Sequence, residues 1–131
     1  MPNRRGFKAA VLLLAACGLA ALAPAAAAGE TVITVLGDSL TAGFGLLPED
    51  AFPAQLEARL QRDGLAVRVV NAGVSGDTSA GVRARLDWVL ADAPDMVIVE
   101  LGANDALRGL APAETEANLD AILEKLKKRG V

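Results

Sequence analysis

The chain has 131 residues, a formal net charge of -3, one cysteine and no histidine or tyrosine. Without histidine it contains no complete Ser-His-Asp triad, no Cys-His pair and no histidine-ligated metal site. A single cysteine forms neither an internal disulfide nor a cysteine-rich zinc site. Aromatic residues make up only 3% of the chain, so no stacking platform for nucleic acid is expected. The length suits one small domain.

Residues 1–28 have the layout of a secretory signal peptide. A positively charged start, Arg4 to Lys8, precedes an apolar run over 9–16 and a run of alanines that ends at Ala28. This order of charged, apolar and small residues predicts cleavage near Ala28. The mature domain is therefore expected to cover 29–131 and to be exported.

Two alternatives for this segment stay open. It is long enough for a transmembrane anchor, and residues 14–17, Leu-Ala-Ala-Cys, resemble a lipobox that would anchor a lipoprotein through Cys17. On the main interpretation Cys17 is removed with the signal, and no stable membrane span is expected in 29–131. Removal leaves 10 basic and 16 acidic residues, an acidic balance that disfavours nucleic acid as a partner.

Three apolar runs predict buried β-strands over 31–36, 65–70 and 96–101. They are rich in β-branched residues and about six residues long, which favours strands over helices. A polar segment that contains glycine follows each run. These segments begin with Gly37-Asp38-Ser39, Asn71-Ala72-Gly73 and Gly102-Ala103-Asn104-Asp105.

Helical patterns follow each predicted strand. The first covers 53–62, with Gly64 placed to end it, and the second runs from Thr78 or Ser79 to Ala91. The third begins near Pro112, has acidic residues at its start and basic residues at its end, and is capped by Gly130. This alternation predicts a parallel, doubly wound α/β sheet in one domain. Because the last helix should lead into another strand, the domain is expected to be interrupted.

The polar segments carry the candidate chemistry, because ligands of open α/β sheets bind at the carboxyl ends of the strands. Ser39, Gly76 and Asn104 are therefore expected to converge on one crevice. Acyl transfer needs a nucleophile, donors for the developing oxyanion and a general base. Ser39 is the candidate nucleophile, and donors are its own N–H, the N–H of Gly76, which has no Cβ, and the Asn104 amide. The base is missing.

Each of these residues also has a structural interpretation. Ser39 suits a helix N-cap, Gly76 a tight turn and Asn104 an Asx turn. Asp38 as a metal ligand is disfavoured, because no partner carboxylates lie at suitable spacing. The sequence therefore predicts neither a metal nor an organic cofactor.

Three segments, 35–43, 71–79 and 99–109, resemble the first three blocks of the GDSL or SGNH hydrolase family. They read Val-Leu-Gly-Asp-Ser-Leu-Thr-Ala-Gly, Asn-Ala-Gly-Val-Ser-Gly-Asp-Thr-Ser and Val-Glu-Leu-Gly-Ala-Asn-Asp-Ala-Leu-Arg-Gly. The closest branch is the periplasmic thioesterase I, lysophospholipase and arylesterase group of Gram-negative bacteria. The resemblance covers 31–131 and implies a flavodoxin-like, three-layer α/β/α fold and a periplasmic location.

Position by position, the resemblance implies that Ser39 is the nucleophile and that Gly76 and Asn104 belong to the oxyanion hole. Asp38 and Asp77 match family positions near the site, where they are expected to order loops. The implied substrate is an acyl ester or thioester, such as a lysophospholipid or an aryl ester, and no cofactor is implied.

Leu107 and Leu110 follow Asn104 in the predicted loop. They either pack in the core against the last helix or, as their family counterparts suggest, line an acyl-chain groove. Both interpretations stay open at this point.

The chain departs from the family in one large respect. The family's fourth block, an Asp-x-x-His that supplies the base and its orienting carboxylate, is absent from the 131 residues. The parent protein is therefore expected to be a serine ester hydrolase, and this chain, as written, an inactive N-terminal portion. The alternatives are a non-catalytic protein that binds acyl compounds or a partner, and a carbohydrate deacetylase of the same fold.

Overall fold

The computed structural model describes residues 29–131, so the expected signal peptide and the alternative anchor at Cys17 lie outside the described residues. The strands are β1 (Thr31–Gly37), β2 (Val67–Gly73) and β3 (Met96–Glu100). The α-helices are α1 (Ser39–Ala42), α2 (Phe52–Arg62), α3 (Ser79–Val89), α4 (Ala103–Leu107) and α5 (Pro112–Arg129), and two 3-10 turns are η1 (Pro48–Asp50) and η2 (Leu90–Asp92). None of the helices in this part of the chain is long and apolar enough to cross a membrane.

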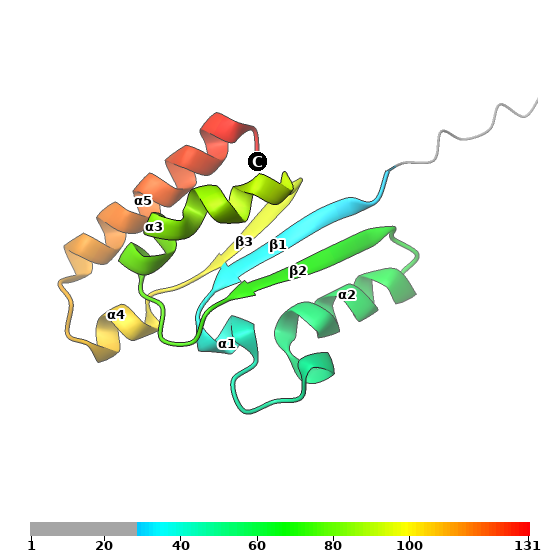
Figure 1. Ribbon diagram of the computed structural model, residues 1–131, viewed down its shortest axis with the longest axis horizontal. Helices are drawn as coiled ribbons and strands as arrows, with labels where there is room; N and C mark the ends of the chain where they lie inside the picture. The colour runs from blue at the N-terminus through cyan, green and yellow to red at the C-terminus, as the bar shows by residue number, and fades with distance from the viewer. Residues whose placement is uncertain (1–28) are drawn as a thin grey trace, which may run out of the picture.

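The three strands form one parallel sheet in the order β2-β1-β3. Helices α3 and α5 cover one face of the sheet, and α1 and α2 lie on the other (Figure 1). Gly37 at the end of β1 is level with Gly73 in β2 and Glu100 in β3. The predicted three-layer α/β arrangement is confirmed, and all three strands deliver their following segments to the same edge.

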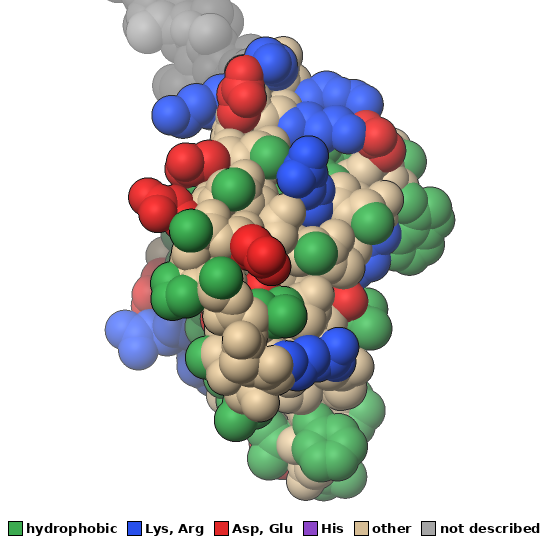
Figure 2. Space-filling model, turned by 90° about the vertical axis from the view of Figure 1, so that its left-hand side faces the viewer, with side chains coloured by type: hydrophobic (Ala, Val, Ile, Leu, Met, Phe, Trp, Pro, Cys, Tyr) green, Lys and Arg blue, Asp and Glu red, His purple; other side chains and the backbone are tan. Residues whose placement is uncertain are grey.

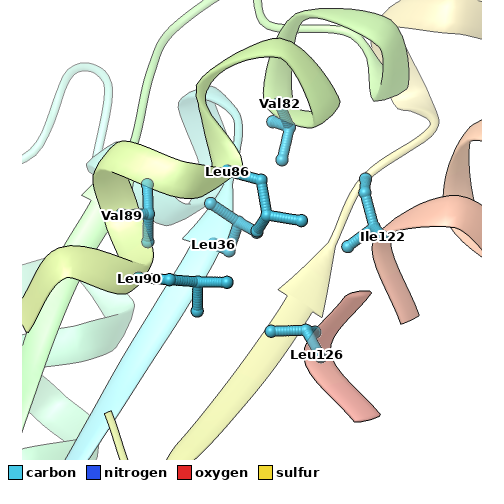
Figure 3. Packing of buried hydrophobic residues seen from close by; sticks show 7 residues of the cluster. All are labelled: Leu36, Val82, Leu86, Val89, Leu90, Ile122 and Leu126. Carbon is cyan, nitrogen blue, oxygen red and sulfur yellow. The ribbon is translucent and has the colours of Figure 1, made fainter. Parts of the chain in front are cut away.

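The main core lies between the sheet and the pair α3 and α5. Leu36 of β1 is enclosed by residues of α3, η2 and α5, which Figure 3 shows converging from three directions: Val82, Leu86, Val89, Leu90, Ile122 and Leu126. Full burial of one such side chain contributes roughly 1.5–3 kcal/mol. This core fixes α3 and α5 relative to β1, and so fixes the segments that enter those helices.

The structure differs from the sequence prediction at the strand ends. Strand β2 begins at Val67 and continues to Gly73, so 71–73 is strand and not loop, because Gly73 still pairs with Gly37 of β1. Helices α1 and α4, predicted as loops, span four and five residues. Helices of about one turn show no hydrophobic periodicity, and sequence patterns therefore miss them.

One buried carboxylate ties three helices together. Asp105 of α4 is 2% exposed and accepts hydrogen bonds from the Ser79 N–H at 2.9 Å, the Ser79 Oγ at 2.5 Å and the Thr115 Oγ1 at 3.1 Å. The Asn118 Nδ2 of α5 donates to the same Ser79 Oγ at 3.1 Å. Burial acts to raise the pKa of Asp105, but the hydrogen bonds from Ser79 and Thr115 outweigh it and hold the pKa below its ordinary value.

Asp105→Asn should flatten the acid dependence of stability. A carboxyl whose pKa is lower in the folded state adds stability above its unfolded pKa, and that stability is lost as the pH falls through its folded pKa. We expect the unaltered chain to lose more unfolding free energy than the variant between about pH 5 and pH 3 in urea titrations. Asp92→Asn, at an exposed position of η2, is the control and should follow the unaltered chain. Parallel curves for Asp105→Asn and the unaltered chain would contradict the assignment.

Thr34→Val should stabilise the fold. Thr34 is 1% exposed in β1, and its Oγ1 has no hydrogen-bond partner among the described residues. Removing an unsatisfied buried hydroxyl at nearly constant shape should raise the unfolding free energy by about 1 kcal/mol, measured by urea unfolding. Thr41 is equally buried but donates to the Glu100 Oε2 at 3.0 Å, so Thr41→Val should lower stability. Equal losses in both variants would refute the prediction.

Candidate active site

The segment after β1 places Ser39 at the start of a short helix. Asp38 is the N-cap of α1, and its Oδ1 accepts from the Leu40 N–H at 3.0 Å. Ser39 is therefore the first helical residue and not the cap, and its own N–H has no partner inside the helix. The Ser39 side chain is half-buried at the strand edge.

Two glycines seat α1 directly on the strand ends. A Cβ on Gly37 would lie 2.1 Å from the Thr41 Oγ1, and a Cβ on Gly73 would lie 2.3 Å from the Ala42 backbone nitrogen. Any side chain at either position would push α1 away from the sheet. The backbone that carries Ser39 is thus packed against β1 and β2 without intervening side chains.

Gly76 lies in a turn after β2. The turn is closed by a bond from the Asp77 N–H to the Val74 carbonyl at 3.0 Å, and the Val74 N–H ties it to the Gly37 carbonyl at 3.0 Å. Gly76 has φ +84°, and an added Cβ would meet only the Arg108 Nη2, at 3.7 Å. The left-handed backbone at this position favours glycine. No group in 29–131 accepts the N–H of Gly76.

Asn104 connects the segments that follow all three strands. It lies in α4, after β3, and its Nδ2 donates to the Asp77 carbonyl at 2.9 Å and to the Asp38 Oδ2 at 3.2 Å. Asp38 precedes Ser39, and Asp77 follows Gly76. The structure thus brings Asn104 together with the immediate chain neighbours of both other candidate residues.

Two arginines that the sequence analysis did not single out hold the Gly76 turn. The Arg85 Nε donates to the Asp77 Oδ2 at 2.7 Å, and its Nη2 donates to the Ala72 carbonyl at 2.8 Å. The Arg108 Nη2 donates to the Gly76 carbonyl at 2.6 Å. A signal for Arg85 was present, because a charged residue stands within the apolar stripe of α3 and such a residue needs a partner. No comparable pattern marks Arg108.

The two candidate substrate-binding leucines lie in different surroundings. Leu110 is 37% exposed and lines a groove of about 540 Å³ between α4 and α5, together with Ala106, Leu119 and Leu123. Leu107, the last residue of α4, is 84% exposed and does not line this groove. The structure therefore places only Leu110 in an apolar concavity.

The face at the strand ends has a mixed surface. Figure 2 shows acidic and basic side chains interspersed over its upper part and apolar side chains gathered at its lower end. The segment between α1 and η1 carries exposed apolar residues, Phe44, Leu46 and Leu47. Within 29–131, no group of three or more histidine, cysteine, aspartate or glutamate side chains is arranged to hold a metal ion.

Curated esterases and thioesterases have sequences similar to this chain. The chain is 45% identical over 120 residues to Esterase TesA of Pseudomonas aeruginosa, covering 91% of this chain and 59% of that protein. It is 46% identical over 103 residues to "Thioesterase 1/protease 1/lysophospholipase L1" of Escherichia coli K12, covering 78% of this chain and 48% of that protein. The chain thus spans about half the length of the curated relatives it matches.

Solved structures of esterases also match the fold of this chain. AlinE4, an SGNH-hydrolase family esterase, matches with a TM-score of 0.74 and 48% identity over 78% of this chain and 56% of its own. The crystal structure of TesA matches with a TM-score of 0.75 and 45% identity over 77% of this chain and 57% of its own. The family model described as "GDSL-like Lipase/Acylhydrolase family" matches residues 35–131. The matched residues include the polar segments after all three strands, and the chain therefore belongs to the GDSL-like lipase/acylhydrolase family.

Proposed function

We propose that this chain carries the nucleophile and the oxyanion hole of a serine ester hydrolase that acts on acyl esters and thioesters. The observation that carries the proposal is the pair of hydrogen bonds from the Asn104 amide to Asp38 and Asp77. These bonds tie the amide to Asp38, which precedes Ser39, and to Asp77, which follows Gly76, and so support a site formed by these segments. Relatives named esterase, arylesterase and thioesterase support the same class of reaction.

The proposed reaction has two steps. The Ser39 Oγ attacks the carbonyl carbon of the ester and loses its proton to a base, and the negative charge moves to the carbonyl oxygen. That oxygen accepts hydrogen bonds from the Ser39 N–H, the Gly76 N–H and the Asn104 Nδ2. Collapse breaks the bond from the carbonyl carbon to the leaving oxygen or sulfur, which takes the proton from the base and departs as an alcohol or thiol. Water then hydrolyses the acyl-serine, which releases the acid and restores the Ser39 hydroxyl. Each donor of this kind typically stabilises the transition state by about 3 kcal/mol.

Asn104 must exchange one hydrogen bond to serve as a donor. Its Nδ2 has two protons, and Asp77 and Asp38 accept both of them, at 2.9 Å and 3.2 Å. The bond to Asp38 is the longer one, so we propose that the oxyanion replaces the Asp38 carboxylate while the bond to the Asp77 carbonyl holds the amide in place.

The base is the component that these residues do not supply. The 131 residues contain no histidine, and serine is a weak nucleophile without a general base. We therefore propose that this chain alone does not turn over esters, and that an Asp-x-x-His segment like the family's fourth block completes the site.

A chimera tests the proposal. Residues 29–131 are joined to the part of Pseudomonas aeruginosa TesA that lies beyond the aligned residues, and hydrolysis of p-nitrophenyl butyrate is measured. We expect turnover by the chimera and only background hydrolysis by the 131-residue chain. Ser39→Ala in the chimera should lower kcat by about 10³-fold or more, and Asn104→Ala should lower it by about 10²-fold to 10³-fold.

The matched control is Ser75→Ala, because Ser75 is an exposed serine next to Gly76 without a role in the proposed mechanism. It should leave kcat unchanged. A folded chimera that hydrolyses the ester equally well with Ser39→Ala would exclude Ser39 as nucleophile. A folded chimera with no turnover at all would favour the non-catalytic binding alternative.

The acyl chain is proposed to lie against the segment after Asn104. Leu110 lines the apolar groove between α4 and α5, and Leu107 presents an exposed apolar side chain at the end of α4. Because apolar contact grows with chain length, a charge in the groove should reduce turnover of long esters more than turnover of short ones.

Leu110→Asp in the chimera should therefore lower kcat/KM for a p-nitrophenyl decanoate ester by at least about tenfold more than for the acetate ester. Leu107→Asp is the comparison and reports whether the exposed leucine takes part. If long and short esters lose activity by the same factor in both variants, this segment is not the acyl groove.

A further inference from the structure

Three side chains from one segment bind three positions of another. Asn104, Asp105 and Arg108 of α4 and its C-terminal end contact residues 77, 79 and 76, respectively. The contacts are the 2.9 Å bond from the Asn104 Nδ2 to the Asp77 carbonyl, the bonds to Asp105 from Ser79, and the 2.6 Å bond from the Arg108 Nη2 to the Gly76 carbonyl. We call this set of contacts the α4 clamp.

Helix α4 depends on these contacts for its position. It is five residues long and has no side-chain hydrogen bond at its N-cap, Gly102. A single helical turn is not stable alone, because nucleating a helix costs more than one turn returns. Its direction must therefore come from side chains that reach other elements.

Asp105 is the buried contact of the clamp. It is 2% exposed, and two of its three hydrogen bonds come from Ser79, the first residue of α3. A carboxylate that accepts from a first-turn N–H is oriented by the helix N-terminus as well as by the hydroxyl. Since Asn104 is the adjacent residue, the Asp105–Ser79 contact also fixes the backbone position from which the Asn104 side chain extends.

Arg108 is the exposed contact. Its guanidinium lies outside the core and donates a hydrogen bond to the Gly76 carbonyl at 2.6 Å. Gly76 has the freedom to take many backbone conformations, so a charged donor on its carbonyl restrains the turn that presents its N–H. The buried and exposed contacts thus act on the two ends of the same four-residue segment, 76–79.

We propose that Asp105 is a positioning residue, which acts through Ser79 to hold α4 against the start of α3 and so orients the Asn104 amide, with Arg108 restraining the Gly76 turn. The catalytic importance of this positioning rests on the proposed function, whereas the positioning itself does not depend on that function. The test therefore uses a signal of Asn104 itself and needs no turnover.

The experiment is nuclear magnetic resonance of the full, ¹⁵N-labelled chain. The Asn104 side-chain amide signals are identified by their loss in Asn104→Asp. In Asp105→Ala they should move to the position of a solvent-exposed asparagine, and exchange of the Ser79 amide should rise at least about tenfold. Asp105→Asn keeps one oxygen for the Ser79 N–H and should restore part of both effects. Arg108→Gln should move the Gly76 amide signal and leave the Asn104 side chain in place.

Thr115→Val is the matched control, because Thr115 donates to the same carboxylate at 3.1 Å but lies in α5. It should lower the unfolding midpoint and leave the Asn104 signals unmoved. If Asp105→Ala does not fold, Ser79→Ala replaces it and should move the Asn104 signals more than Thr115→Val does.

Unmoved Asn104 signals in a folded Asp105→Ala or Ser79→Ala chain would overturn the proposal and reduce Asp105 to a stabilising group. An unaltered chain whose Asn104 amide already has the solvent-exposed signal would overturn it as well. Failure of the chimera to hydrolyse esters would contradict the proposed function alone, because the α4 clamp is tested by resonance signals that do not depend on turnover.

Discussion

The level ending of three parallel strands is the constraint on which the rest of the site depends. Gly37 pairs with Gly73 on one side and Glu100 on the other, so the chain leaves the sheet three times at one edge. Residues far apart in sequence become neighbours there without any long loop. The two glycines at that edge then allow α1 to rest on the strand ends, and the polar side chains need only short reaches to meet.

Charge at this edge is compensated locally. Asp77 is paired with Arg85, and Asp105 is surrounded by hydroxyl and N–H donors. A buried carboxylate without such partners would cost several kcal/mol. The donors also fix direction, because each hydrogen bond restrains the group that makes it. The same contacts that make the burial of these carboxylates tolerable therefore give the strand-end segments defined conformations.

The sequence was sufficient for the parallel α/β class and for the long helices, because strands and helices of ordinary length show clear periodicity. It was insufficient for α1 and α4, which are too short to show periodicity. It was also insufficient for the end of β2, because the polar Asn71 made this part of the strand resemble a loop. The prediction that Ser39, Gly76 and Asn104 lie at one edge followed from topology, and the structure places their segments in contact there. The roles of Asp105 and Arg108 could not be predicted, since they depend on tertiary burial and on a side chain reaching another loop.

The strand order also determines when the edge is assembled. Central β1 pairs with β3, whose residues lie about 60 positions further along the chain. Strand β1 can pair with β2 without β3, but α4 takes its place only after β3 has joined the other side of β1. The segments that carry Ser39 and the Gly76 turn can therefore meet before the Asn104 amide bridges them. The pairing of β1 with β3 is the most non-local strand pairing in the described domain, so folding of the sheet controls when the Asn104 amide reaches the other two segments.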